Sequence, residues 1–303
     1  SALGEAFIPQ AILAGLYAPV CGCIVAFLLG ANTTMIYSPR SIVTFLIGSI
    51  VLHSFARSNI PLLQTAPAAT LLILSLLLVF LAGFFQTLFG LFKMGTFVKY
   101  IPAPVIAGFQ NAAAILIFMS QLDSMLGFRQ HVAPIDIPFN LAQLQLPTLL
   151  TGVLTCALIL RGARITKIIP PTILGLIGGV IAYYLLAAAG FAAHLSPTLR
   201  TIPFAWPDAH YFGDFFSLAA DERFRPVVPT LIGGALSLAI VASLDGMLCA
   251  RLVESDSGHR VRSNSELMRL GVGNMVAAGF GGIANGINLG SSFANHRSGA
   301  TTR

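Results

Sequence analysis

The sequence predicts an all-α polytopic membrane protein with an inverted-repeat transporter fold and two broken helices. Of its 303 residues, 56% are hydrophobic and only 9% are charged, whereas a soluble domain carries about a quarter charged residues. The apolar runs are numerous enough for about nine or ten spans of ~20 residues each. Polar residues interrupt two of these spans, at 32–40 and at 285–297. Interrupted helices in matching places of two halves indicate inverted repeats with a substrate site near the membrane midplane.

The first complete span is expected at Ala11–Gly30, and the polar segment 32–40 separates it from a second apolar helix, Ser41–His53. Ser38 is predicted to cap that helix, with Pro39 at its first position, because these residue types favour those two places. The first interruption is therefore expected to be a helix that begins inside the membrane.

Further spans follow along the chain and are expected at Ala68–Phe92, Val105–Leu122, Leu149–Leu160, Ile173–Ala189, Val228–Leu252 and Leu267–Phe280. The amphipathic segment 191–225 is interpreted as a polar excursion between two halves. We therefore expect one partial transport domain over 1–303, with a first repeat at about 1–190 and the start of a second at about 226–303. Both ends look cut, so the fold is expected to be incomplete at both ends.

Charge is distributed as membrane topology predicts. The net charge is +6, but the basic residues lie between spans and form no single stripe, which argues against nucleic acid as a partner. Nine Lys or Arg residues fall in the turns 93–99, 161–167 and 251–269. Alternating spans place these turns on one face, which is the cytoplasmic face by the positive-inside rule. The lipid bilayer is thus an expected partner, and a bacterial inner (plasma) membrane the expected location.

The second interruption, Gly281–Ala300, is too rich in Gly, Asn and Ser for an ordinary span. Irregular backbone at membrane depth occurs only where it is buried in protein or lines a cavity. A helix starting at about Ser291 would direct free N–H groups and its positive dipole end into that cavity, which favours an anion. The alternative is a Gly-rich loop between two spans.

Two charged residues stand out within or beside apolar runs. A carboxylate inside a span, here Asp245, costs roughly 2.5–3.5 kcal/mol on insertion scales and so has a partner or a role. Arg40 is expected in the first turn of its helix, where it could grip an oxyanion with two N–H groups. The alternative is that Arg40 reaches water or pairs with Asp245.

Enzyme and metal chemistry are not indicated. Cys21, Cys23, Cys156 and Cys249 all lie in apolar runs without a CxxC or zinc-ligand spacing, so they are interpreted as packing residues. The six His residues are scattered and form no metal or nucleophile–base motif. We expect no metal and no enzymatic activity.

Several motifs in order resemble one family, the SulP (sulfate permease) inorganic anion transporters. They are Gly15-Leu16-Tyr17-Ala18, Gly30–Val43, Tyr100–Phe109 with Ser120-Gln121-Leu122, Asp245–Leu248, Asn264–Asn274 and Gly281–Arg303. The resemblance covers nearly the whole chain. It implies a seven-plus-seven inverted-repeat fold, of which this chain would hold a part, and a STAS domain that commonly follows in the family and is not found in these residues.

Departures from the family pattern affect the expected site. The family's Ser-Arg pair on the tenth helix aligns with Gly290-Ser291, so its arginine is missing, and the family's hydrophobic residue after Gly-Pro on the third helix aligns with Arg40. We expect Arg40 to replace the missing arginine. The acidic residue at the place of Asp245 is tied to Na⁺ or H⁺ coupling in the family. Cys249 stands where Na⁺-using relatives offer a hydroxyl, which weakens the case for Na⁺.

The resemblance and the broken helices together predict a secondary active transporter of a small inorganic or carboxylate anion, such as sulfate, bicarbonate or a dicarboxylate. Cation coupling is assigned to Asp245, with Na⁺ or H⁺ and no other cofactor. The expected substrate-binding residues are Tyr37, Ser38, Arg40, Asn288, Leu289, Gly290 and Ser291. A nucleobase transporter of the same fold and a non-transporting membrane subunit remain as alternatives, and a homodimer is also considered.

Overall fold

The computed structural model describes residues 8–30, 34–56, 67–100, 102–128, 134–140, 144–165, 171–195, 206–258, 260–297 and 299–300. Several residues used in the sequence predictions lie outside these ranges, namely Asn32, Lys167, His259, Ser298 and residues 196–205. The chain divides into two compact units, one formed by 1–106 with 200–303 and the other by 107–199. The beginning and the end of the chain therefore pack together, although the predicted repeats follow one another in sequence.

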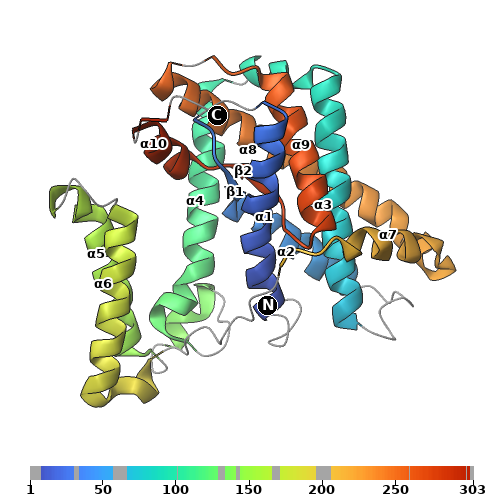
Figure 1. Cartoon of the computed structure of the whole chain (residues 1–303). Helices are drawn as coiled ribbons and strands as arrows, with labels where there is room; N and C mark the ends of the chain where they lie inside the picture. The colour runs from blue at the N-terminus through green and yellow to red at the C-terminus, as the bar shows by residue number, and fades with distance from the viewer. Residues whose placement is uncertain are drawn as a thin grey trace. The chain divides into compact units, whose positions relative to one another are not determined.

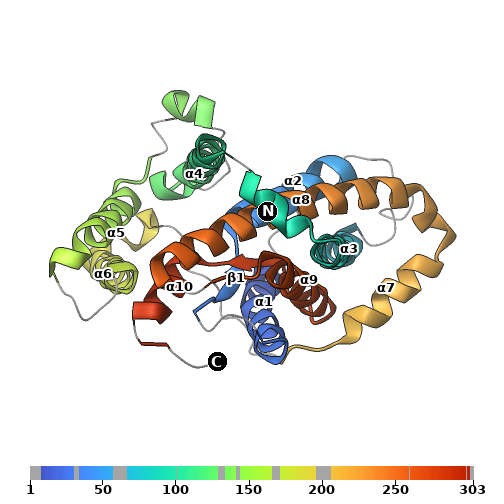
Figure 2. The same ribbon diagram turned by 90° about the horizontal axis from the view of Figure 1, so that it is seen from above.

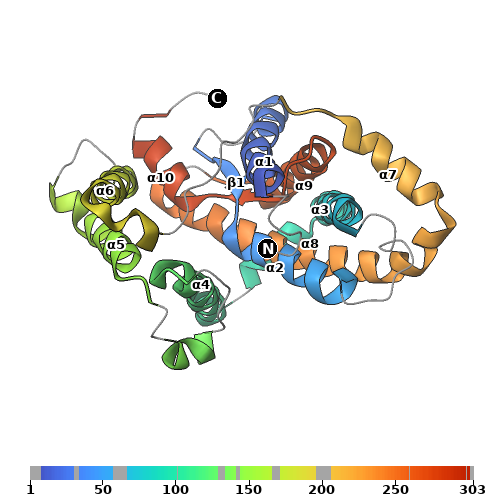
Figure 3. The ribbon, with the colours of Figure 1, turned by 90° about the horizontal axis from the view of Figure 1, so that it is seen from below.

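The first unit is helical around one short strand pair (Figure 1). Its helices are α1 (Ile8–Leu28), α2 (Ser41–Ile50), α3 (Pro67–Leu91), α7 (His210–Ala220), α8 (Val228–Ser257), α9 (Ser263–Gly279) and α10 (Leu289–Arg297), and its strands are β1 (Tyr37–Pro39) and β2 (Asn285–Ile287). A π-helical turn, Val51–Ala56, continues α2, and two 3₁₀ segments cover Met94–Tyr100 and Glu222–Val227. Seen end-on in Figures 2 and 3, α1, α9 and α3 are neighbours in that order, and the long α8 runs beside them.

The second unit contains most of α4 (Ala103–Leu126), together with α5 (Leu146–Ile165) and α6 (Pro171–Leu186). A π-helical turn, Ala187–Phe191, and two 3₁₀ segments, Pro134–Phe139 and Ala192–His194, complete it. Helices α5 and α6 pack on each other, and a Cβ on Gly175 would lie 2.3 Å from Ile159 Cγ1. The absence of a side chain at Gly175 is what allows this close approach.

Four helical segments in the described ranges are long and apolar enough to cross a membrane. They are Pro9–Leu28, Ala69–Leu91, Ile173–Phe191 and Glu222–Ser257. Shorter apolar helices cover Ser41–His53, Ala114–Leu126 and Leu146–Gly162. Helices occupy the places of the spans expected from hydropathy, but α9, at the expected span Leu267–Phe280, is not among these apolar segments. Helix α8 continues to Ser257 and shortens the charged turn before α9.

Helix α1 shows how the surface is divided between protein and lipid. Leu16, Val20 and Ile24 are each more than half exposed, and they recur every four residues along one face of the helix. Ala14 and Ala18 on the other face are buried. A row of exposed Leu, Val and Ile is unfavourable in water but matches hydrocarbon, so this face suits contact with lipid.

The core of the first unit lies where α3 meets α8 and α2. Leu74 and Leu78 of α3 and Leu231 and Leu238 of α8 are fully buried in it.

Helices α3 and α9 pack closely at two glycines, Gly83 of α3 and Gly271 of α9. A Cβ on Gly83 would lie 2.6 Å from the Gly271 carbonyl oxygen. Small residues let membrane helices approach this closely, since packing rather than the hydrophobic effect drives their association.

Two of the three basic turns lie at the same end of the first unit. A Cβ on Gly95, in the turn after α3, would lie 2.8 Å from Asn264 Oδ1 at the start of α9. The guanidinium of Arg269 reaches the same end of α1, where its Nε donates to the Leu29 carbonyl oxygen at 3.0 Å. This is the arrangement that the charge pattern requires of the turns at 93–99 and 251–269.

Candidate functional site

The two interrupted segments pair with each other as antiparallel three-residue strands, β1 and β2, and we call this strand pair the crossing. Tyr37 pairs with Ile287, Ser38 with Gly286 and Pro39 with Asn285. Strand β1 leads directly into α2 and β2 into α10, so two half-helices leave this crossing with their N-termini beside it (Figure 1). The interruption at Gly281–Ala300 is therefore a broken helix and not merely a loop between spans.

Asn288 organises the start of α10. Its Oδ1 accepts a hydrogen bond from the Ser291 N–H at 3.1 Å, which is the bond of a helix N-cap, and its own N–H donates to the Ile36 carbonyl oxygen at 2.9 Å. Its Nδ2 donates to Ser38 Oγ at 2.8 Å. The helix begins at Leu289, two residues earlier than the sequence predicts, because Asn288 satisfies the donor at its third position.

The prediction that Ser38 caps α2 is wrong. Ser38 lies in β1, and Arg40 occupies the N-cap position with an extended backbone and no side-chain cap hydrogen bond. The strand pairing keeps residues 37–39 extended, so the helix cannot begin at Pro39. Arg40 is consequently not in the first helical turn, and no side chain caps the N–H groups at the start of α2.

Ser38 stands at the centre of the crossing, opposite Gly286. Its Oγ accepts the hydrogen bond from Asn288, so the hydroxyl proton is available to donate to a further group. Leu289 is half-buried, and Gly290 and Ser291 are exposed within the described residues. The crossing thus presents one hydroxyl donor and the first N–H groups of α10 together.

Arg40 and Asp245 form a two-point ion pair between the crossing and α8. Arg40 Nε lies 2.8 Å from Asp245 Oδ2, and Nη2 lies 2.9 Å from Oδ1. The Asp245 side chain is 6% exposed and that of Arg40 24%. Gly286 makes room for the pair, since a Cβ there would lie 2.5 Å from Arg40 Cγ. The pairing alternative for Arg40 is what the structure shows, and a direct contact between Arg40 and an anion stays a prediction.

Tyr37 is placed differently from the other predicted site residues. Its side chain is 2% exposed, and its hydroxyl donates to Glu266 of α9, whose other oxygen accepts from Arg269 Nη1 at 2.9 Å. The alternation of side chains along an extended strand explains this, since neighbouring residues of β1 point to opposite sides. The side chain of Tyr37 therefore holds β1 to α9 and is turned away from Ser38.

The structure thus brings together Ser38, Asn288, Leu289, Gly290 and Ser291, with the Arg40–Asp245 pair beside them. Sequence reasoning missed three further residues, Gly286, Glu266 and Asn274. Glu266 and Asn274 are both buried on α9, and a buried polar residue needs a partner. That signal was present in the sequence, but it does not say which partner is used.

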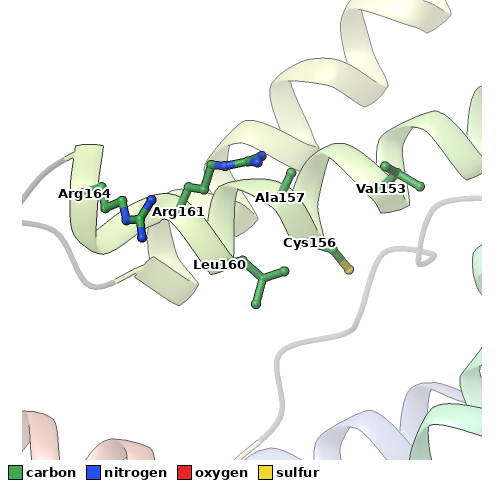
Figure 4. Close-up of a pocket in the computed structure, with 6 residues that line it drawn as sticks. All are labelled: Val153, Cys156, Ala157, Leu160, Arg161 and Arg164. Atoms are coloured by element: carbon green, nitrogen blue, oxygen red, sulfur yellow. The ribbon is translucent and has the colours of Figure 1, made fainter.

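The described residues contain no group of three or more His, Cys, Asp or Glu suited to hold a metal ion. A hollow of about 450 Å³ lies elsewhere, on α5 in the second unit (Figure 4). Its lining residues are Val153, Cys156, Ala157, Leu160, Arg161 and Arg164. All six come from one helix, so the hollow is a surface groove and does not belong to the strand crossing.

Comparison with known proteins decides the family. The profile of the sulfate permease family matches residues 2–303 of the chain. The chain belongs to the sulfate permease family. This confirms the family expected from the sequence motifs, which is a family of integral, multi-pass membrane proteins whose members are anion transporters and not enzymes.

The names of two relatives in the sulfate permease family give different substrates. The chain is 28% identical over 304 residues to the bicarbonate transporter BicA of Picosynechococcus, covering 95% of this chain and 49% of that protein. It is 25% identical over 316 residues to the sodium-independent sulfate anion transporter of Bos taurus, covering 95% and 50%. The chain thus spans about half the length of these two relatives.

A solved structure shows that the sulfate permease fold is shared. The transmembrane domain of a cyanobacterial BicA superposes with a TM-score of 0.72 at 22% identity, covering 99% of this chain and 73% of that one. At this identity the likeness concerns the fold, and it confirms the inverted-repeat architecture predicted from the two broken helices.

Proposed function

We propose that this member of the sulfate permease family is a secondary active transporter that binds a small anion at the crossing of β1 and β2. The observation that carries the proposal is the antiparallel pairing of Tyr37–Pro39 with Asn285–Ile287. This pairing brings the N-termini of two half-helices to one place, where each contributes the equivalent of roughly half a positive charge.

The proposed ligands of the anion are hydrogen-bond donors and not a full cation. Ser38 supplies a hydroxyl proton, Leu289 and Gly290 supply N–H groups, and the uncapped start of α2 supplies others. Asn288 and Ser291 frame the site, since the amide of Asn288 fixes both Ser38 and the first turn of α10. Oxyanions suit such a set because each oxygen can accept from several donors.

The charge at the proposed site limits which anions fit. Arg40 and Asp245 neutralise each other, and two helix N-termini amount to about one positive charge. A monovalent oxyanion such as bicarbonate is balanced by that charge. A divalent one, sulfate or a dicarboxylate, is balanced only if a cation is bound with it, and Asp245 is the residue to which we assign Na⁺ or H⁺ coupling.

A nucleobase is a poorer match for this site. Recognition of ring N–H groups requires acceptor oxygens, whereas the groups assigned to the crossing are donors and the charge of Asp245 is already paired with Arg40. The donors at the crossing complement an anion instead.

We further propose that the protein resides in a bacterial inner membrane with the basic turns facing the cytoplasm.

The test is uptake by the full-length protein in proteoliposomes. Labelled bicarbonate, sulfate, a dicarboxylate and uracil are offered with a Na⁺ gradient, with a proton gradient and with neither. We expect saturable uptake of at least one oxyanion and a weaker apparent affinity in Ser38→Ala. Uptake of uracil alone would support the nucleobase alternative, and the absence of any uptake by folded protein would support a non-transporting subunit.

A further inference from the structure

The position of the anion donors depends on a very short strand pair. Two-stranded ribbons of this size are marginal by themselves, and a slip of one residue turns every side chain to the opposite side. After such a slip Gly286 would no longer lie beneath the Arg40 side chain, and Asn288 would lose its hydrogen bonds to Ile36 and Ser38. The register of β2 must therefore be fixed by contacts beyond its pairing with β1.

One such contact is the side-chain amide of Asn274 on α9, which binds the main chain of β2 at two points. Asn274 Oδ1 accepts from the Asn285 N–H at 2.7 Å, and Asn274 Nδ2 donates to the Asn285 carbonyl oxygen at 3.3 Å. This is the exchange of N–H and C=O bonds that a neighbouring strand would make. The amide of Asn274 thus takes the place of a third strand at Asn285.

The same amide is itself held in one orientation. The second hydrogen of Asn274 Nδ2 is directed to Gln86 Oε1 of α3 at 2.8 Å. The side chain of Asn285 extends this series of hydrogen bonds, because its Nδ2 donates to the Ala18 carbonyl oxygen of α1 at 2.7 Å. Gln86, Asn274 and Asn285 are each at most 1% exposed, so water does not compete for these bonds.

The packing of α1 leaves room for the hydrogen-bonded side chain of Asn285. A Cβ on Gly22 of α1 would lie 2.7 Å from Asn285 Nδ2, so a side chain there would displace the amide. The Ile283 N–H donates to the Ala14 carbonyl oxygen at 3.2 Å and fixes the segment just before β2 to the same helix. Strand β2 is therefore located by α9 on one side and by α1 on the other.

We propose that Asn274 is a positioning residue of the anion site, which sets the register of β2 and through it the place of the α10 N-terminus. It makes no contact with the anion and acts through Asn285. The proposal rests on the proposed function for its effect on transport, but its effect on β2 is independent of any ligand.

The closing experiment measures β2 directly in the full-length protein without anion, by hydrogen exchange of the peptide covering 283–292. Asn274→Leu preserves size and removes all three hydrogen bonds, so we expect exchange of this peptide to rise at least about tenfold. The matched control is Leu270→Ala, on the same face of α9 and 2% exposed. It should lower thermal stability without a selective rise in that peptide.

Asn274→Asp provides a graded variant in case the leucine variant does not fold. An aspartate keeps the acceptor for the Asn285 N–H and loses the donor to the Asn285 carbonyl oxygen. Gln86 Nε2 has no partner within the described residues, so a rotation of that amide would give the carboxylate a donor. We expect an intermediate rise in exchange at 283–292.

Transport adds a second measurement, with labelled sulfate and labelled bicarbonate as probes. A displaced α10 N-terminus should raise KM about tenfold in Asn274→Leu with Vmax per folded molecule within about twofold, whereas simple loss of stability would lower only the total Vmax and leave KM unchanged. Unchanged exchange at 283–292, or unchanged KM in a variant whose exchange has risen, would overturn the proposal. If the wild-type protein takes up neither probe, the proposed function fails while the exchange result still decides the role of Asn274.

Discussion

The guanidinium of Arg40 and the carboxylate of Asp245 meet side-on, with Nε–Oδ2 and Nη2–Oδ1 distances of 2.8 and 2.9 Å. The two residues lie 205 positions apart in the chain. This pair connects the start of one half-helix to α8, so it ties the proposed anion site to the residue expected to sense the coupling cation.

Removing one partner of this pair should destabilise the protein more than removing both. Arg40→Gln leaves the nearly buried Asp245 without a counter-charge, which costs on the order of 3 kcal/mol. Asp245→Asn in the same protein removes the uncompensated charge, so we expect the thermal midpoint in detergent to recover most of the loss. Near-normal anion affinity in the double variant would show that Arg40 is a structural counter-ion only. Persistent loss of affinity in the double variant, with stability recovered, would show that Arg40 contacts the anion directly.

Asp245→Asn alone should separate accumulation from exchange. If the carboxylate couples the cation, the variant should exchange labelled anion across the membrane but no longer concentrate it when a Na⁺ or proton gradient is imposed. The measurement is the steady-state ratio of internal to external anion in proteoliposomes. Accumulation at the wild-type level would remove Asp245 from the coupling role.

Gly290→Leu should abolish transport while leaving the protein folded. A Cβ at this position would meet only Asn288 Oδ1, at an ordinary contact distance of 3.6 Å. The larger side chain is therefore tolerated by the fold but extends over the exposed first turn of α10, where the anion is proposed to bind. Gly233→Leu on α8 is the matched control, since nothing lies within 4 Å of a Cβ there. Normal uptake by the Gly290 variant would contradict the placement of the site.

Gly83→Ala should destabilise the packing of α3 on α9 by roughly 1–3 kcal/mol, because overpacking forces the two backbones apart. The added Cβ would lie 2.6 Å from the Gly271 carbonyl oxygen and 2.9 Å from the Met275 nitrogen, neither of which can rotate away. Gly48→Ala in α2 meets nothing within 4 Å and serves as the control. Equal thermal midpoints for the two variants in detergent would refute the importance of this contact.

The sequence alone determined the membrane class, the helical spans and the two places where a helix is broken. Those features are local, because about twenty consecutive apolar residues define a span and a cluster of Asn, Ser and Gly within it excludes a regular one. The motifs likewise identified the family, and with it the expectation of an inverted-repeat fold.

Only the tertiary structure decided which residues meet at the breaks. Ser38 suits an N-cap by residue type, yet pairing with Gly286 places it in a strand and moves the start of α2 to Ser41. The position of Tyr37 next to Ser38 predicts a shared role at the anion site, but the Tyr37 hydroxyl binds Glu266, 229 residues away. A buried polar side chain signals that it needs a partner, whereas the choice among partners depends on how distant helices approach, which no local pattern records.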